Sequence, residues 1–280
     1  MTLKVTQLMP SFSGAAASQT ASVTLPLGLS FEQLYLTYSG ITLAQMTNIV
    51  VKANGKEIMN FRSGTELDRF NQFQGRAAAS GVLAIDFCRY GMRTRAAEEY
   101  TKLGTGFPVN TQEADSKGNA NPLFNPYPVT ILTLQIDCAA ATTPVFTLYA
   151  CLSDPAPTGF IRKIQRFEYS ASAGGQYQIS DLPKGDLINM AFFIATDITA
   201  LQVTRDKYTV FDRTDTLNDV IQLDGVRVPL SYFFAYDPTE NGNGSEGLPT
   251  AGVNDLRFIL TKTASGSIPT TIDYIGLLSR

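Results

Sequence analysis

The most constraining feature of this 280-residue sequence is a repeat within the chain. The segment LPLG at residues 25–28 returns as LPKG at residues 182–185, and the dipeptide IT at residues 41–42 returns at residues 198–199. Both matches are displaced by the same 157 positions (182 − 25 and 198 − 41). A constant offset over two separate matches predicts a duplicated module, which divides the chain into two units of ordinary domain size.

The stretch from residue 23 to residue 57 contains the signals of a strand-rich domain. Apolar and more polar residues alternate over residues 33–38, as expected of a strand with one buried face. Further along, Asn54 followed by Gly55 predicts a type I′ turn between two antiparallel strands. The first module is therefore expected to begin with strands joined by tight turns.

One helix is expected directly after the hairpin in each module. Ser63 with Glu66 three residues later has the pattern of a capping box, and apolar residues follow at helical spacing. A similar pattern begins at Thr214, where Leu217 matches Leu67 at an offset of 150 (217 − 67). The second copy has therefore lost seven residues (157 − 150) between its turn and its helix, and a shorter hairpin is the expected reason.

Many short strands with a single helix in each module favour an all-β protein of two tandem Greek-key or jelly-roll sandwiches rather than βαβ units. The segment SDPAPTG, with two prolines and a glycine, predicts a short stiff linker at residues 153–159. The first jelly roll is then expected at residues 1–152 and the second at residues 160–280. The segment 104–128 lacks periodicity, and its aromatic residues predict an ordered loop that packs on the module or on a neighbour.

The residue types that are missing exclude many enzymes. The chain has no histidine, the commonest general base, nucleophile activator and metal ligand, and no tryptophan for stacking on sugars. A formal net charge of −3 argues against binding that depends on neutralising nucleic-acid phosphates. No segment approaches the roughly 20 apolar residues of a membrane span. We therefore expect a protein that is not an enzyme, with no sequence-specific nucleic-acid partner and no transmembrane segment.

The three cysteines, Cys88, Cys138 and Cys151, are odd in number and widely spaced. They show no metal-ligand pattern, and they are expected to be reduced, buried side chains within strands. The N-terminal residues 1–14 lack the apolar core of a signal peptide. Both features favour folding in a reducing cytoplasm.

One loop is a candidate metal site. Residues 237–246, DPTENGNGSE, bring together the oxygen ligands that Ca²⁺ accepts, and a calcium ion is expected at Asp237, Glu240 and Asn243. The spacing does not match an EF-hand, so a solvated loop between strands is the simpler alternative.

Two other stretches suggest contacts between parts of the protein. A basic cluster at residues 162–166 could contact anionic lipid or nucleic acid, but in a net acidic chain a solvated strand edge or an ion pair at an interface is favoured. Aromatic runs at residues 192–193 and 232–236 break strand alternation. Both faces of those strands are therefore expected to be covered, by the other module or by another subunit.

With these motifs, the chain resembles the major coat protein of corticoviruses, tailless icosahedral bacteriophages with an internal membrane. No single motif is diagnostic of a chemistry, and their order along both modules carries the resemblance. That coat protein is a double jelly roll, so the resemblance implies two tandem eight-stranded jelly rolls with short helices in each. The motifs are LPLG at residues 25–28, LYLTYSGIT at 34–42, NIVVKANGKEI at 48–58, SDLPKG at 180–185 and IDYIGLLSR at 272–280.

The resemblance implies the major capsid protein of a virion, present in the cytoplasm of the bacterial host during assembly. It implies a homotrimer of pseudo-hexagonal outline, in which two jelly rolls per subunit give six similar wedges. The implied partners are neighbouring capsomers, vertex and minor capsid proteins, and proteins of the internal membrane. Members of this family bind calcium, but no ligand motif carries over, so the calcium prediction rests on the composition of the loop.

Two other functions stay open at this point. A tandem β-sandwich that binds a glycan or a receptor, as a spike does, would need a pocket rich in aromatic and amide side chains. A hydrolase that uses carboxylates alone, as glycosidases do, is chemically possible without histidine. It would need two carboxyl groups facing each other in a cleft, and the sequence shows no such pair.

Overall fold

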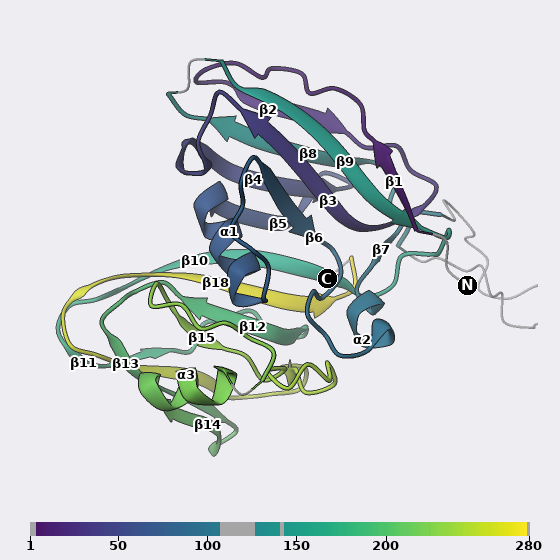
Figure 1. The fold of residues 1–280 in the computed structure, drawn as a ribbon. Coiled ribbons are helices and arrows are strands. Elements are labelled where there is room, and N and C mark those ends of the chain that lie inside the picture. Colours follow the sequence, from purple (N-terminus) through teal and green to yellow (C-terminus); the bar gives the residue numbers. More distant parts are fainter. Residues whose placement is uncertain (1–3, 107–126, 141–142, 224, 279–280) are drawn as a thin grey trace, which may run out of the picture.

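The computed structural model describes residues 4–106, 127–140, 143–223 and 225–278. Most of the loop expected at residues 104–128 lies outside the described residues. The chain forms two β modules, one above the other in Figure 1, with α1 between them and α3 at the outer end of the second module. Among the described residues, no helix is long and apolar enough to cross a membrane.

The described residues of the first module form nine strands, two α-helices and one 3-10 turn. They are β1 (Val5–Leu8), β2 (Thr20–Thr24), β3 (Ser30–Ser39), η1 (Leu43–Gln45), β4 (Met46–Ala53), β5 (Lys56–Ser63), α1 (Gly64–Phe73), β6 (Val82–Asp86), α2 (Arg95–Glu99), β7 (Leu103–Gly104), β8 (Leu132–Cys138) and β9 (Val145–Ser153).

The second module contains nine strands and one helix in the described residues. They are β10 (Ile161–Ala171), β11 (Gly175–Ile179), β12 (Leu187–Phe193), β13 (Ile198–Arg205), β14 (Tyr208–Thr214), α3 (Asp215–Leu223), β15 (Phe234–Tyr236), β16 (Leu248–Pro249), β17 (Leu256–Lys262) and β18 (Gly266–Gly276).

Each module is a sandwich of two antiparallel layers. In the first module the layers run β1-β9-β3-β6 and β5-β4-β8-β2, and in the second they run β10-β18-β12-β15 and β14-β13-β17-β11. The two orders are the same, because each strand of the first module matches the strand nine places later in the second. Even the short strands agree, since β7 pairs with β3 and β16 pairs with β12. The fold is a double jelly roll, as the sequence predicted.

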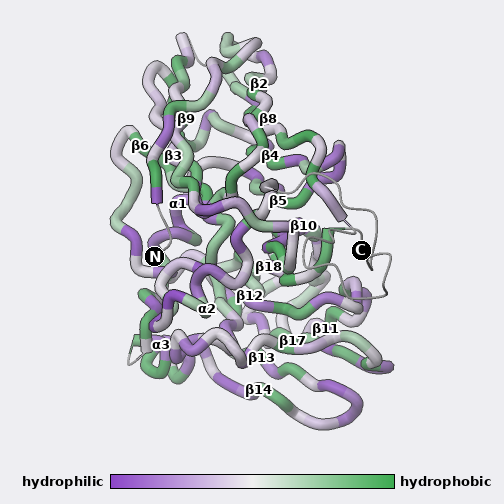
Figure 2. The backbone as a smooth tube through the Cα atoms, turned by 90° about the vertical axis from the view of Figure 1, so that its right-hand side faces the viewer, coloured by the Kyte–Doolittle hydropathy of each residue, from purple (hydrophilic) through white to green (hydrophobic). Residues whose placement is uncertain are grey.

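The modules join edge to edge. β5 and β10 pair in parallel at Met59 and Ile164, which merges one layer of each module into a nine-stranded sheet. Figure 2 shows these strands one after another from β2 to β12. Each module encloses its own apolar core, and the first core extends into the second module through Met190, Phe192 and Phe233.

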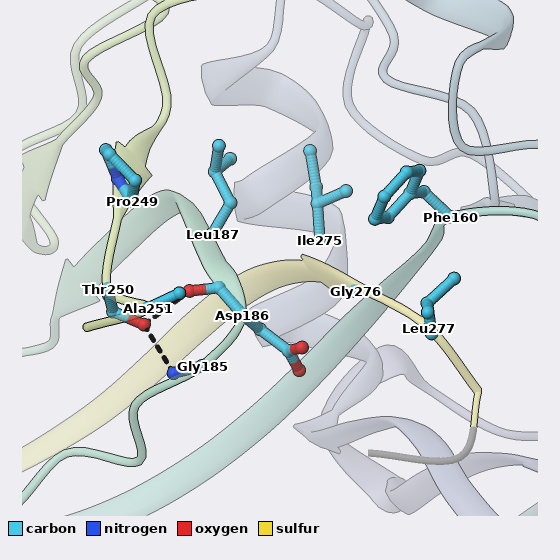
Figure 3. A pocket seen from close by; sticks show the side chains of 10 residues that line it. All are labelled: Phe160, Gly185, Asp186, Leu187, Pro249, Thr250, Ala251, Ile275, Gly276 and Leu277. Atoms are coloured by element: carbon cyan, nitrogen blue, oxygen red, sulfur yellow. Dashed lines mark hydrogen bonds between the residues drawn. The ribbon is translucent and has the colours of Figure 1, made fainter.

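The duplication extends to single hydrogen bonds. Gly28 and Gly185, from the two LPxG segments, have φ angles of 128° and 117°, a region that residues with a side chain rarely adopt. Their N–H groups donate to the hydroxyls of Thr105 (3.0 Å) and Thr250 (2.8 Å), and Figure 3 shows the second of these bonds. Each hydroxyl in turn donates to the carbonyl of the residue after the glycine. The LPxG repeat therefore marks the same turn in both modules.

Both modules also carry the same β-bulge. The register of β3 against β9 shifts between Phe31 and Gln33, and that of β12 against β18 shifts between Ile188 and Met190. These positions differ by 157 residues (188 − 31 and 190 − 33). The predicted offset therefore holds from the LPxG turn into the strand that follows it.

The second sequence match, the IT dipeptide, is not a structural equivalence. Residues 41–42 lie in the turn between β3 and η1, whereas residues 198–199 are the first two residues of β13. The connection from β12 to β13 is shorter than the connection from β3 to β4, so the offset between matching positions has already changed before β13. The agreement of the IT match with the 157 offset is therefore accidental.

The expected shortening of the second hairpin is also wrong. The two hairpin turns, at residues 54–55 and 206–207, are 152 positions apart (206 − 54), and all four turn residues have positive φ, as a type I′ turn requires. The residues that precede α1 and α3, Ser63 and Thr214, are 151 positions apart (214 − 63). Most of the lost residues therefore lie before the hairpin, in the shorter β12 and its connection to β13.

Candidate functional site

Asp237, the first expected calcium ligand, lies directly after β15 and is paired with an arginine. Nε of Arg227 lies 2.5 Å from its Oδ2, and neither side chain is exposed. Its other oxygen accepts hydrogen bonds from the N–H and the hydroxyl of Thr239, both at 2.7 Å. This carboxylate is therefore fully engaged within the protein.

The other two expected ligands, Glu240 and Asn243, contact different residues from those that Asp237 contacts. Glu240 receives two hydrogen bonds from the guanidinium of Arg213, at 2.8 and 2.9 Å. Asn243 lines an open pocket together with Arg89 and Tyr100. The part of the chain that the structure describes contains no group of three or more Cys, Asp or Glu residues suited to a metal ion. Calcium binding at this loop stays a prediction, and an ion bound there would have to replace arginine partners.

The ion pair of Asp237 has a counterpart in the first module. Arg76 donates two hydrogen bonds to Asp86, at 3.0 and 2.7 Å, and these residues precede Arg227 and Asp237 by 151 positions (227 − 76 and 237 − 86). In both modules the pair ties the segment after the helix to the end of the next strand. Its repetition indicates that Asp237 belongs to the jelly-roll framework.

The basic cluster at residues 162–166 forms ion pairs at the junction of the two modules. Arg162 of β10 pairs with Asp273 of β18 (2.9 Å) and also donates to the carbonyls of Asp86 and Cys88 in the first module. Burial is the largest single influence and lowers the pKa of Arg162, but the charge and hydrogen bond of Asp273, with smaller contributions from Asp86 and Cys88, together raise that pKa above its usual value. Lys163 pairs with Asp186 (2.8 Å). Both cations therefore form ion pairs within the second module, and Arg162 joins the two modules through its hydrogen bonds to the first.

Helix α1 packs on the outward face of the layer β10-β18-β12-β15 through aromatic side chains. The ring of Phe70 stacks on that of Phe192, with centroids 4.1 Å apart, and meets the edge of Phe233 at 5.7 Å. The guanidinium of Arg69 lies 3.4 Å from the centre of the Tyr232 ring. Because Phe193 points to the other side and packs near Phe258, both faces of β12 are covered, as the aromatic runs predicted.

A polar network surrounds the same contact. Glu66 in the first turn of α1 accepts a hydrogen bond from the hydroxyl of Thr271 on β18 (2.6 Å) and pairs with Arg62 (2.9 Å). The hydroxyl of Ser63 caps the helix by accepting from the N–H of Glu66. The carboxylate of Glu66 accepts a hydrogen bond from the N–H of Arg62, whereas in a capping box it would accept from the N–H of the next residue, Ser63. Arg62 also donates to Glu168, to Thr271 and to the carbonyls of Phe167 and Thr270.

An open pocket of about 260 Å³ lies beside the junction, between the ends of β10, β12, β16 and β18 (Figure 3). Its one carboxylate, Asp186, is held by Lys163, and a side chain at Gly276 would collide with it. The lining contains neither a second carboxylate nor an amide side chain. This pocket therefore fits neither the glycosidase nor the glycan-binding alternative.

Profiles of two protein domains match the chain in the order of its modules. The viral coat protein P2 N-terminal domain matches residues 6–153, and the viral coat protein P2 C-terminal domain matches residues 161–278. The chain belongs to the viral coat protein P2 family. The expected corticovirus-like family is thereby confirmed.

Individual relatives agree with this assignment. The major capsid protein P2 of Pseudoalteromonas phage PM2 is 30% identical over 83 residues, which span 30% of this chain and 31% of that relative. The crystal structure of the PM2 protein superposes with a TM-score of 0.87 and 22% identity over 99% of each chain. A capsid structure of Sulfolobus Turreted Icosahedral Virus superposes with a TM-score of 0.66 and 11% identity, over 98% of this chain and 91% of that one.

This P2-family chain is a viral capsid protein, a structural component of the virion rather than an enzyme. Such a role requires assembly with other capsid subunits. The contacts on which this role depends are therefore those between subunits. Sequence reasoning located the aromatic and basic residues of the junction, but it missed the Arg–Asp pairs. The paired residues correspond at an offset of 151 positions, whereas the sequence comparison aligned the two modules at an offset of 157.

Proposed function

We propose that this coat protein forms homotrimeric capsomers of pseudo-hexagonal outline in an icosahedral shell around an internal membrane. The observation that carries the proposal is the identical strand order of the two modules. Two modules of one design in each subunit supply six similar units to a three-fold ring. Head-to-tail contacts close such a ring without self-complementary surfaces.

The basic residues of β10 support a structural role rather than the binding of an anionic ligand. The cations Arg162 and Lys163 are used in ion pairs inside the chain. The formal net charge of −3 argues against binding that depends on neutralising nucleic-acid phosphates. The partners in this proposal are neighbouring capsomers, vertex and minor capsid proteins and proteins of the enclosed membrane, as the family resemblance implies.

Native mass spectrometry of the purified full chain tests the capsomer. The proposal expects a species of three times the subunit mass of 30.4 kDa. A chain that remains monomeric at high protein concentration, with no tendency to assemble, would contradict it. A stable dimer would contradict the three-fold arrangement as well.

A further inference from the structure

The two helices that follow the hairpins have different surroundings. α1 is covered by the second module within the same chain, whereas the matching face of α3 is open. Leu217 and Val220 are 48% and 53% exposed, and Leu223, one turn further on, is 64% exposed. At an offset of 151, Leu217 matches Glu66, Val220 matches Arg69, and Ile221 matches Phe70.

These α3 residues form an apolar stripe, because positions three apart lie on one side of a helix. We name Leu217, Val220, Ile221 and Leu223 the α3 surface. The α1 residues at the first three of these positions make the contacts to Thr271, Tyr232 and Phe192. The module plan thus places a docking helix at this position, and the described residues of the same chain provide no layer that receives the second copy.

The receiving layer for α1 also has an uncovered counterpart. α1 sits on the layer β10-β18-β12-β15, which matches β1-β9-β3-β6 in the first module. Thr271 lies opposite Phe192 across β18 and β12, just as Tyr149 lies opposite Tyr35 across β9 and β3. The positions that receive α1 therefore correspond to two tyrosines of the first module, and Tyr149 is 38% exposed.

Further apolar side chains extend this uncovered face. Leu8 lies opposite Tyr149 across β1 and β9, so the two side chains share one side of the sheet, and Leu8 is 58% exposed. Val82 and Val145 are 44% and 57% exposed. Val82 matches Phe233, a contact of Phe70, at an offset of 151 (233 − 82). We name Leu8, Tyr35, Val82, Val145 and Tyr149 the β9 face.

The edge strands show the same contrast. All four residues of β1 are exposed, and in the part of the chain that the structure describes this edge strand pairs with β9 alone. The matching strand β10 is mostly buried or half-buried, because β5 and the first module lie against it. An open edge strand beside an apolar face is a surface that proteins usually cover.

We propose that the α3 surface of one subunit docks on the β9 face of a second copy, repeating between chains the contact that α1 makes within the chain. The two surfaces differ, so the contact is head-to-tail, and it closes in a ring of three subunits. This inference rests on the proposed capsomer and names its interface. Arg213 occupies the position of the bridging Arg62 at an offset of 151 (213 − 62), at the edge of the α3 surface.

The double variant Leu217→Asp with Val220→Asp tests the docking. Both side chains are exposed in the single chain, so the variant is expected to fold with an unchanged circular dichroism spectrum. Two carboxylates buried against the β9 face are expected to raise the concentration needed for trimers by about a hundredfold or more. The control Ile131→Asp changes an apolar side chain that is 45% exposed outside both surfaces, and it is expected to leave the trimer intact.

A cysteine pair tests which surfaces meet. Glu66 contacts Thr271 within the chain, so the matching pair between chains is Leu217 and Tyr149. The variant Leu217→Cys with Tyr149→Cys is expected to give covalent dimers and trimers on oxidation, whereas Leu217→Cys with Ile131→Cys gives none.

The outcomes separate this inference from the proposed function. If the wild type and the aspartate variant both form trimers, and the cysteine variant gives no cross-link, the proposed docking surfaces are wrong but the trimeric capsomer is not contradicted. A wild-type chain that stays monomeric would overturn both.

Discussion

The two modules share strand order, the LPxG turn, the β-bulge and the Arg–Asp pair, and they differ in what covers the helix after the hairpin. α1 lies between the modules and contacts Phe192, Phe233 and Tyr232. α3 carries apolar residues at the matching positions and leaves them in solvent. The difference indicates that in this duplicated jelly roll the first helix docks on the other module of the same chain, whereas the second helix is left to dock on another subunit.

The largest expected effect concerns the two Arg–Asp pairs. Asp237→Ala leaves the guanidinium of Arg227, which is 0% exposed, without its partner, and the free energy of unfolding should fall by about 3–5 kcal/mol. Asp86→Ala should cost less, because Arg76 is 16% exposed and lies over the ring of Tyr90. Urea unfolding of both variants measures the difference, and equal losses would show that burial does not distinguish the pairs.

Next comes the pair of helix positions that defines the contrast. Phe70→Ala removes a ring from the aromatic cluster between the modules, and we expect a loss of about 3 kcal/mol in the free energy of unfolding. Ile221→Ala, at the matching position of α3, should cost less than about 1 kcal/mol in the monomer. The comparison should be made at concentrations where the chain is monomeric, and a similar loss at both positions would break it.

The LPxG turns should respond alike. Thr105→Val and Thr250→Val each remove a hydroxyl that bonds a glycine N–H and a carbonyl, and each should lower the free energy of unfolding by about 1–3 kcal/mol. The two losses are expected to agree within about 0.5 kcal/mol. A large disagreement in the urea midpoints would mean that the turns are not equivalent.

The smallest effect is expected from chelation. If the loop at residues 237–246 holds calcium, a chelator should lower the melting temperature of the assembly by about 2–4 °C, which corresponds to a loss of about 1 kcal/mol in a chain of this size. Asn243→Ala, which leaves both arginine pairs intact, should abolish the response to the chelator. Unchanged melting of the wild type would remove this site.

Local signals in the sequence predicted the local structure well. LPxG marked a turn in each module, Asn54 with Gly55 marked a type I′ hairpin, and Ser63 marked the start of α1. These features depend on neighbours in the sequence, whose chemistry is visible in the chain itself. Two tandem β-sandwich modules followed from the repetition of such signals, and the family resemblance identified them as jelly rolls.

The aromatic runs indicated that the strands of the junction are covered, but the partners of most contacts between distant segments were not predicted. The composition of the loop after β15 suggested metal ligands, but the arginine partners of Asp237 and Glu240 come from other segments. The exposure of Leu217 and Val220 could not be predicted either. An apolar stripe on a helix has the same sequence pattern whether it packs against its own chain or against another one. Their matching to Glu66 and Arg69 needed the corrected offset of 151.

The central claim, that two modules of one plan occupy equivalent places in the assembly, is tested most directly by electron microscopy of the isolated capsomer viewed along its axis. The account predicts a ring of six similar lobes with three-fold symmetry, in which the two modules alternate. A projection with three separate lobes, with two-fold symmetry or without a closed ring would contradict it.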